Sequence, residues 1–207
     1  NGAMDEAAAI ETARALAAKA ETLEDLKNAM AEFDGCALKA TAKNLVFSDG
    51  QADAKIMIIG EAPGGDEDRQ GKPFVGAAGQ LLDQMLASIG LSRDENVYIT
   101  NVVPWRPPGN RTPTLDEIAV CKPFLTRHIE LMQPDILLLV GNISNKSLLA
   151  TTTGITKLRG QWQSYEADGA AIKAMPLLHP AYILRRPETK ADMWADLCLL
   201  KKDMIQA

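Results

Sequence analysis

The sequence predicts an α/β fold in which a central four-stranded parallel sheet lies between two layers of helices. Two observations carry this prediction. Short, nearly continuous apolar runs alternate along the chain with longer segments of helical periodicity, and such runs are typical of buried parallel strands. The chain has 207 residues, of which 46% are hydrophobic, and this is enough for one domain with a full core.

Four apolar runs are the candidate strands, and helical patterns separate them. The strands are predicted over Ala54–Gly60, Asn96–Val103, Asp135–Gly141 and Ile172–Leu178. A hairpin that turns at Asp168-Gly169 is expected to lead into the last strand. The helices are predicted over residues 5–33, with a break at Thr22, and over Ala77–Gly90, Thr114–Met132, Asn142–Ala150 and Pro187–Ile205.

The net charge of −5 is unevenly distributed along the chain. Residues 1–35 hold eight acidic and three basic side chains, and the rest of the chain is neutral. We therefore expect an acidic helical segment over residues 1–35, with residues 1–3 foreign to the protein, and a main domain over residues 36–207. A neutral domain can still carry a local basic face, so net charge does not exclude a polyanionic partner.

The cysteine pattern and the hydropathy narrow the class of protein further. Cys36, Cys121 and Cys198 are widely spaced, which favours buried thiols over a disulfide framework or a CxxC metal pair. No apolar run approaches the roughly 20 residues that span a bilayer, and the first residues do not resemble a signal peptide. The expectation is a cytoplasmic protein without a membrane partner.

Polar groups follow the predicted strands at the point where each strand ends. Gly60-Glu61 follows the first, Asn101 lies near the end of the second, and Gly141-Asn142 and His179 follow the third and fourth. In open parallel sheets, ligands bind beyond the carboxyl ends of the strands. These groups are therefore expected to converge on one rim and form a site there.

Four motifs in this order resemble the uracil-DNA glycosylase superfamily, most closely its family four. They are GEAPG (60–64), GKPFVGAAG (71–79), YITNVVPWRPPGNRTP (98–113) and LLHPAYILRRP (177–187). The resemblance extends from about Gly35 to Asp196. It implies a four-stranded parallel sheet with helices on both faces, in agreement with the strand pattern, and an enzyme that removes uracil from DNA.

The resemblance assigns the base-binding residues. A base flipped out of a duplex must be held by its face and its edge. Phe74 matches the residue that stacks on the base, the alternative being a core Phe under the loop. Asn101 matches the residue that reads the uracil edge with one acceptor and one donor; the alternative is an Asn that serves only a turn.

The remaining pocket residues follow from the same motifs. His179 would donate to uracil O2 as negative charge builds there, unless it only caps a helix. Glu61 would either activate water or stabilise the cationic sugar. Gly60 and Ala62 flank it, and Glu67 matches a position near the C5 edge of uracil. Asp66 and Asp68, with Glu67, otherwise read as a solvated acidic run.

The last motif also matches the minor-groove loop of the family. Its candidates for filling the vacated base stack are Tyr182, Ile183 and Leu184. Arginines that would meet phosphates are Arg185 and Arg186 in this loop and Arg106 and Arg111 in the third motif, with Lys157 and Arg159 as further basic residues.

Family four usually carries a [4Fe–4S] cluster on four cysteines, and here the pattern departs from the family. The corresponding residues are Phe33, Cys36, Trp105 and Cys121. Because a cubane cluster needs a ligand at each iron, the sequence predicts that no cluster and no other cofactor is bound. Phe33 and Trp105 are expected to fill the vacated volume.

The sequence therefore predicts a monofunctional uracil-DNA glycosylase that starts base excision repair. Its partners would be uracil-containing DNA and the abasic product, and it would work as a monomer, associated with the nucleoid. The main alternative is a protein of the same fold that binds abasic sites with little turnover. A small-molecule hydrolase is a third possibility, which the arginines and the apolar loop disfavour.

Overall fold

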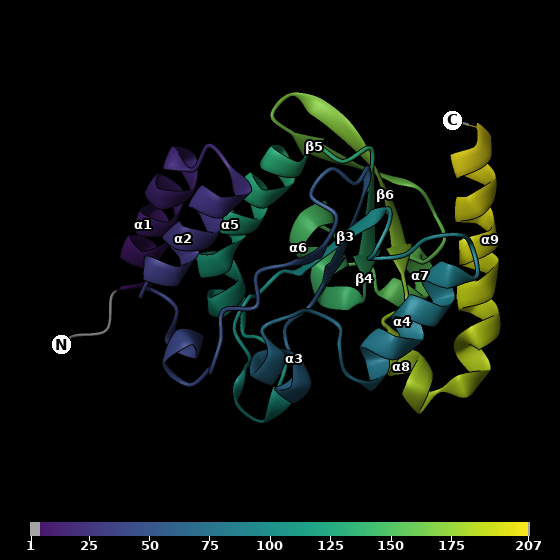
Figure 1. Ribbon diagram of the computed structural model, residues 1–207, viewed down its shortest axis with the longest axis horizontal. Coiled ribbons are helices and arrows are strands. Elements are labelled where there is room, and N and C mark those ends of the chain that lie inside the picture. Colours follow the sequence, from purple (N-terminus) through teal and green to yellow (C-terminus); the bar gives the residue numbers. More distant parts are fainter. Residues whose placement is uncertain (1–4, 207) are drawn as a thin grey trace.

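The computed structural model describes residues 5–206, so the expectation for residues 1–3 lies outside the described part of the chain. Figure 1 shows a sheet between two groups of helices, with the N-terminal helices on one side and the C-terminal helix on the other. Within the described part, no helix is long and apolar enough to cross a membrane.

The sheet has six strands in the order β1-β3-β2-β4-β6-β5. They are β1 (Asp49–Gly50), β2 (Ile56–Gly60), β3 (Val97–Asn101), β4 (Ile136–Val140), β5 (Gln163–Ala167) and β6 (Ala170–Leu177). Each of the four predicted strands is present, and β3, β2, β4 and β6 form a continuous parallel sheet. The prediction of a four-stranded sheet needs one correction, because β1 and β5 add an antiparallel strand at each edge.

The helices are α1 (Glu6–Lys19), α2 (Leu23–Glu32), α3 (Gly65–Gln70), α4 (Ala77–Ala87), α5 (Leu115–Met132), α6 (Asn142–Leu149), α7 (Ile155–Leu158), α8 (Pro180–Arg185) and α9 (Lys190–Gln206), with 3₁₀ turns at Ala37–Ala40, Pro108–Asn110 and Pro187–Thr189. The predicted helices are present as α1, α2, α4, α5, α6 and α9, whereas the short helices α3, α7 and α8 were not predicted. Thr22 accepts a hydrogen bond from the amide of Asp25 at the start of α2, which confirms the break there.

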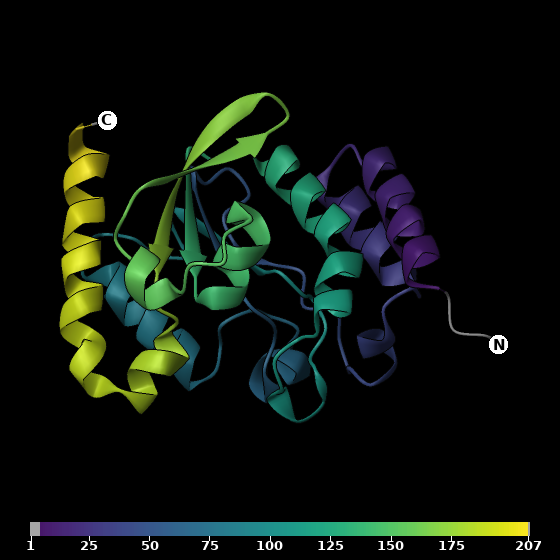
Figure 2. The ribbon, with the colours of Figure 1, turned by 180° about the vertical axis from the view of Figure 1, so that it is seen from behind.

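Strand residues alternate between two apolar cores, one on each face of the sheet. Met57 and Ile59 face the core shared with α1, α2 and α5, whereas Ile56 and Ile58 face the core shared with α4 and α9. This alternation is the two-residue period of an extended strand with both faces buried. Figure 2 shows the same three layers from behind, so the α/β/α prediction is confirmed.

Candidate active site

A cavity of about 310 Å³ lies at the carboxyl ends of β2 and β3. Its lining includes Glu61, Ala62, Glu67, Phe74, Asn101, Arg111 and His179. Gly60 lies beneath it, because a Cβ at this position would meet the Phe74 ring and the Asn101 side chain. The structure thus brings the expected base-binding residues together, although His179 and Gly60 are far apart in the sequence.

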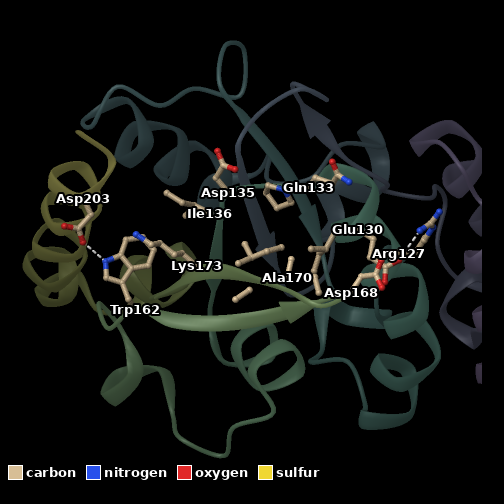
Figure 3. A pocket seen from close by; sticks show the side chains of 15 residues that line it. Arg127, Glu130, Gln133, Asp135, Ile136, Trp162, Asp168, Ala170, Lys173 and Asp203 are labelled. Atoms are coloured by element: carbon tan, nitrogen blue, oxygen red, sulfur yellow. Dashed lines mark hydrogen bonds and ion pairs between the residues drawn. The ribbon is translucent and has the colours of Figure 1, made fainter. Parts of the chain in front are cut away.

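A larger cavity of about 710 Å³ lies at the opposite end of the sheet. It is lined by Ile136 and Ala170, at the amino ends of β4 and β6, and Figure 3 shows Trp162 and Arg127 at its two ends. None of the motif residues faces it. We assign the site to the smaller cavity because its lining contains Phe74, Asn101 and His179, whereas the larger cavity has none of the motif residues.

Asn101 contributes an unsatisfied acceptor to the smaller cavity. Its side chain is only 5% exposed, and its Oδ1 atom has no hydrogen-bond partner among the described residues. A buried acceptor without a partner costs about 1–3 kcal/mol, so it is expected where a ligand supplies the missing donor. The position of Asn101 at the end of β3, opposite Gly60 of β2, directs this acceptor to the rim.

Phe74 provides an aromatic wall in an unusual backbone conformation. Its φ is 54°, in the left-handed region that bulky residues rarely adopt. The side chain is buried in the core between the sheet and α4, and its ring stacks beside that of His179 at a centroid distance of 5.6 Å. The alternative of a core Phe is therefore partly realised, but the residue also lines the cavity.

His179 is held as a neutral imidazole with a defined tautomer. Its Nδ1 atom accepts a hydrogen bond of 3.0 Å from the Ala181 amide, at the start of α8. Burial, assisted by Arg185, lowers the pKa of His179 to about 4. At neutral pH the ring proton therefore lies on Nε2, which leaves one N–H donor besides the helix-capping contact.

The two glutamates of the cavity have different environments. Burial raises the pKa of Glu61 above its ordinary value, and Arg185 opposes this shift. Glu67 Oε1 accepts hydrogen bonds from the amides of Val75 and Gly76 at 3.0 and 2.9 Å, and its Oε2 accepts one from Gly64. Glu61 therefore keeps its carboxylate available, while Glu67 uses its own to shape the loop.

The prediction of a solvated acidic run holds for Asp66, whose side chain is 48% exposed, but is wrong for Asp68. Asp66 to Asp68 lie in α3, and Asp68 is 3% exposed. Its Oδ1 atom accepts hydrogen bonds from the amides of Lys43 and Asn44 at 2.8 and 3.0 Å. A carboxylate that caps two amides is stable when buried, and here it fixes the connector before β1 to the site.

The minor-groove motif forms the short helix α8 rather than a loop. Ile183 is fully buried in the core, so this residue cannot fill a vacated base stack in the present conformation. Tyr182 is half-buried beneath the Arg186 guanidinium. Leu184 is 48% exposed, and it is the one candidate of the three that projects freely.

The basic residues divide into exposed and engaged side chains. Arg185 and Arg186 are exposed. Arg111 is engaged by Glu117 through two bonds of 2.7 and 3.0 Å, and Arg106 donates to Asn110 at 2.6 Å. Lys157 is exposed as well.

Arg159, named above as a further basic residue, forms a buried ion pair. Its Nε and Nη2 atoms bond both oxygens of Asp196 at 3.0 and 3.1 Å, and Asp196 is 5% exposed. This pair fixes the segment after α7 to α9. Because the guanidinium fork is already occupied by a buried carboxylate, Arg159 is not free for a phosphate.

Sequence reasoning missed Arg93, which lies in the turn between α4 and β3. Its guanidinium donates to the carbonyl oxygens of Pro73 and Phe74 at 2.9 and 2.6 Å. The residue stands in the polar segment SRDEN, and nothing in that pattern distinguishes it from an ordinary surface arginine.

An aromatic wall, an unsatisfied amide and a neutral imidazole at the rim of a parallel sheet define a pocket for a flat, hydrogen-bonding ring such as a nucleobase. The comparisons with known proteins specify the family. The uracil DNA glycosylase superfamily matches residues 47–198. The chain therefore belongs to the uracil-DNA glycosylase superfamily, a family of DNA N-glycosylases.

Named relatives place the chain near one branch of that family. It is 39% identical to the type-4 uracil-DNA glycosylase of Archaeoglobus fulgidus, over 85% of this chain and 90% of that protein. It is 41% identical to the type-4 enzyme of Sulfurisphaera tokodaii, over 82% and 79%, and 39% identical to that of Thermotoga maritima, over 80% and 84%.

The four positions that match the family's cluster ligands do not fit an iron–sulfur cluster. Phe33 and Trp105 are 2% and 1% exposed, and the Phe33 ring packs edge-on against Phe124 at 5.1 Å. Cys36 and Cys121 are buried free thiols. Two thiols beside two large apolar side chains supply half of the thiolates that a cubane cluster requires.

Proposed function

We propose that this protein removes uracil from DNA by hydrolysing the bond between the base and the deoxyribose. The observation that carries the proposal is the buried, unpartnered Oδ1 of Asn101 beside the Phe74 ring. The identity to type-4 enzymes over most of the chain supports it. The product would be an abasic site, the first intermediate of base excision repair.

Base recognition would use the edge and face of a flipped uracil. The Oδ1 atom of Asn101 would accept from uracil N3–H, and its Nδ2 would donate to O4. Phe74 would stack on the ring, and a stacked base typically gains about 1–3 kcal/mol. Thymine has the same edge, so its exclusion would depend on bulk near C5, for which Glu67 remains the proposed residue.

Bond cleavage would place positive charge on the sugar and negative charge on the leaving uracil. The Nε2–H of His179 would donate to O2, where the negative charge develops. Water would add its oxygen to C1′, and the released uracil anion would take up a proton. The Glu61 carboxylate would stabilise the sugar cation or orient this water. Every group in the scheme comes from one chain, so we expect a monomer to suffice.

DNA would lie across α8. Leu184 would fill the space that the flipped base leaves, and Arg185 and Arg186 would neutralise phosphates on either side. Because Arg185 lies close enough to influence both Glu61 and His179 electrostatically, the phosphate contact and the reacting bond would be adjacent.

We also propose that the protein works without an iron–sulfur cluster. The packing of Phe33 and Trp105 supports this, since both fill the position where ligands would stand. The purified protein should be colourless and contain no stoichiometric iron by elemental analysis. About four irons per chain would contradict this proposal. The paired variant Phe33→Cys with Trp105→Cys restores four cysteines and provides the matched comparison.

The activity is tested by incubating the protein with a labelled oligonucleotide that carries one uracil, and with the same oligonucleotide carrying thymine. We expect release of free uracil and an alkali-labile abasic site in the first, and no release in the second. Tight binding to abasic DNA without uracil release would contradict the proposal and favour the damage-binding alternative.

A further inference from the structure

The backbone around Phe74 is held from two sides by charged side chains, one of which lies 19 to 20 residues away in the sequence. Arg93 donates to the carbonyl oxygens of Pro73 and Phe74. On the following residues, Glu67 accepts from the amides of Val75 and Gly76. A cation thus holds the carbonyls and an anion holds the amides of one short loop.

The guanidinium of Arg93 is itself fixed in place. Its side chain is 12% exposed and forms ion pairs with Asp49 of β1 at 3.1 Å and Asp83 of α4 at 3.0 Å. The backbone carbonyl of Arg93 accepts from the Gln51 side chain at 3.2 Å. An arginine held by two carboxylates is a rigid donor, because its planar fork cannot turn without losing these bonds.

The conformation that Arg93 holds is one that Phe74 would not adopt readily by itself. A bulky residue at a φ of 54° is strained, and this conformation persists only when its surroundings enforce it. This φ determines where the Cα–Cβ bond points, and here it directs the ring over Gly60 and beside His179. A relaxed backbone would direct the ring elsewhere.

We propose that Arg93 is a positioning residue that holds Phe74 in the left-handed conformation from which its ring can stack on the bound base. The inference rests on the proposed function, since it assigns a cause to the stacking geometry. Arg93 does not line the cavity, and it acts through the two carbonyl groups.

The test is a double-mutant cycle measured by single-turnover release of uracil from a labelled oligonucleotide. Arg93→Ala should lower the rate by about 5- to 150-fold, the loss that removal of a stacked aromatic ring typically causes. In a Phe74→Ala background the same change should cost almost nothing further, because the ring that Arg93 positions is already absent. Affinity for undamaged DNA should stay at the wild-type level.

Arg127→Ala is the matched control. Arg127 also forks onto a backbone carbonyl, that of Ala20, at 3.0 and 2.7 Å, and pairs with Glu130. It lines the larger cavity (Figure 3), which shares no lining residue with the site. This variant should unfold at a lower temperature but release uracil at the wild-type rate, so general loss of stability is separated from loss of positioning.

Two results would overturn the inference: a wild-type rate in Arg93→Ala, or an equal loss in the presence and absence of the Phe74 ring. If Arg93→Ala does not fold, the same double-mutant cycle is measured with Arg93→Lys, because lysine keeps a charge for the two aspartates but lacks the planar guanidinium. If wild type itself releases no uracil, the proposed function fails, and this outcome is distinct from failure of the inference.

Discussion

At the scale of single residues, the site depends on polar atoms that keep hydrogen-bonding capacity after folding. Asn101 keeps an acceptor without a partner, and His179 keeps one N–H after its other nitrogen has capped α8. Folded proteins satisfy nearly all buried polar atoms. We interpret the exception beside the Phe74 ring as a recognition feature, and in the proposed function the choice of base would depend on hydrogen-bond direction.

Asn101→Asp tests this recognition. The change replaces the Nδ2 donor with an oxygen that would face uracil O4, so two acceptors would meet. We expect kcat/KM for uracil release to fall by about 5- to 150-fold, which corresponds to the roughly 1–3 kcal/mol of an unpaired buried polar group. Asn145→Asp is a control, because Asn145 is also buried and its Oδ1 also lacks a partner among the described residues, but its Nδ2 bonds the carbonyls of Leu139 and Gly141 and it does not line the cavity. Wild-type kcat/KM in Asn101→Asp would exclude Asn101 as the residue that recognises the uracil edge.

Side chains that act alone at a strand end were predictable from the sequence, and side chains that act through the backbone were not. Asn101 and His179 stand where parallel strands end, and this position has a known consequence. Arg93 and Asp68 act on amide or carbonyl groups of segments 19 to 25 residues away. Such contacts depend on three-dimensional packing, and no pattern of residue spacing in the sequence predicts them.

At the scale of elements, α8 combines packing with exposure. Its residues Pro180 and Ile183 are buried while Leu184, Arg185 and Arg186 are exposed. One face of a short helix therefore anchors it to the core, and the other presents an apolar tip next to two cations. The motif suggested a loop with three equivalent apolar residues, but helical geometry separates neighbours in sequence onto different faces.

Leu184→Ala should affect duplex DNA more than single-stranded DNA. In a duplex the apolar tip would occupy the space of the flipped base, whereas a single strand has no stack to fill. We expect the single-turnover rate on duplex uracil to fall roughly tenfold and the rate on single-stranded uracil to change little. Ile205→Ala, at an exposed apolar position near the end of α9, should change neither. An equal loss on both substrates would refute the wedge role.

At the scale of the whole molecule, two apolar cores hold the rim in place, and one of them contains a buried histidine. His128 of α5 is 2% exposed, stacks on Phe47 at 4.5 Å and meets the Tyr98 hydroxyl at 2.7 Å. Burial lowers the pKa of His128 to about 3 from an ordinary value of 6.5. The unfolded chain therefore binds a proton that the folded protein does not.

Stability should consequently fall on acidification. A lowered folded-state pKa means that the unfolded state gains protons first, so the free energy of unfolding decreases as pH falls from about 6.5 towards 3. For His128 the loss between pH 7 and pH 5 is about 2 kcal/mol. Urea unfolding at both pH values should show that His128→Gln loses less stability than wild type by about this amount. Identical pH dependence in the two proteins would contradict the assignment.

The overall architecture was largely predictable, because the period of apolar residues reflects burial directly. Met57 and Ile58 belong to opposite cores, as an apolar run with both faces covered requires. The hairpin that contains the edge strand β5 was also predicted, and only the edge strand β1 was missed. β1 has only two residues, and its pairing with β3 depends on where the connector lies rather than on its own sequence.

The central claim is that uracil leaves DNA in the cavity between Asn101 and His179. It is tested most directly by single-turnover uracil release and abasic-DNA affinity, measured together for wild type and His179→Ala. Removing one preorganised donor should lower the rate by roughly 10²–10³-fold, which corresponds to about 2.7–4 kcal/mol, and leave the affinity near that of wild type. Uracil release by His179→Ala at the wild-type rate would contradict the account, because the bond would then be broken without the group that this cavity supplies.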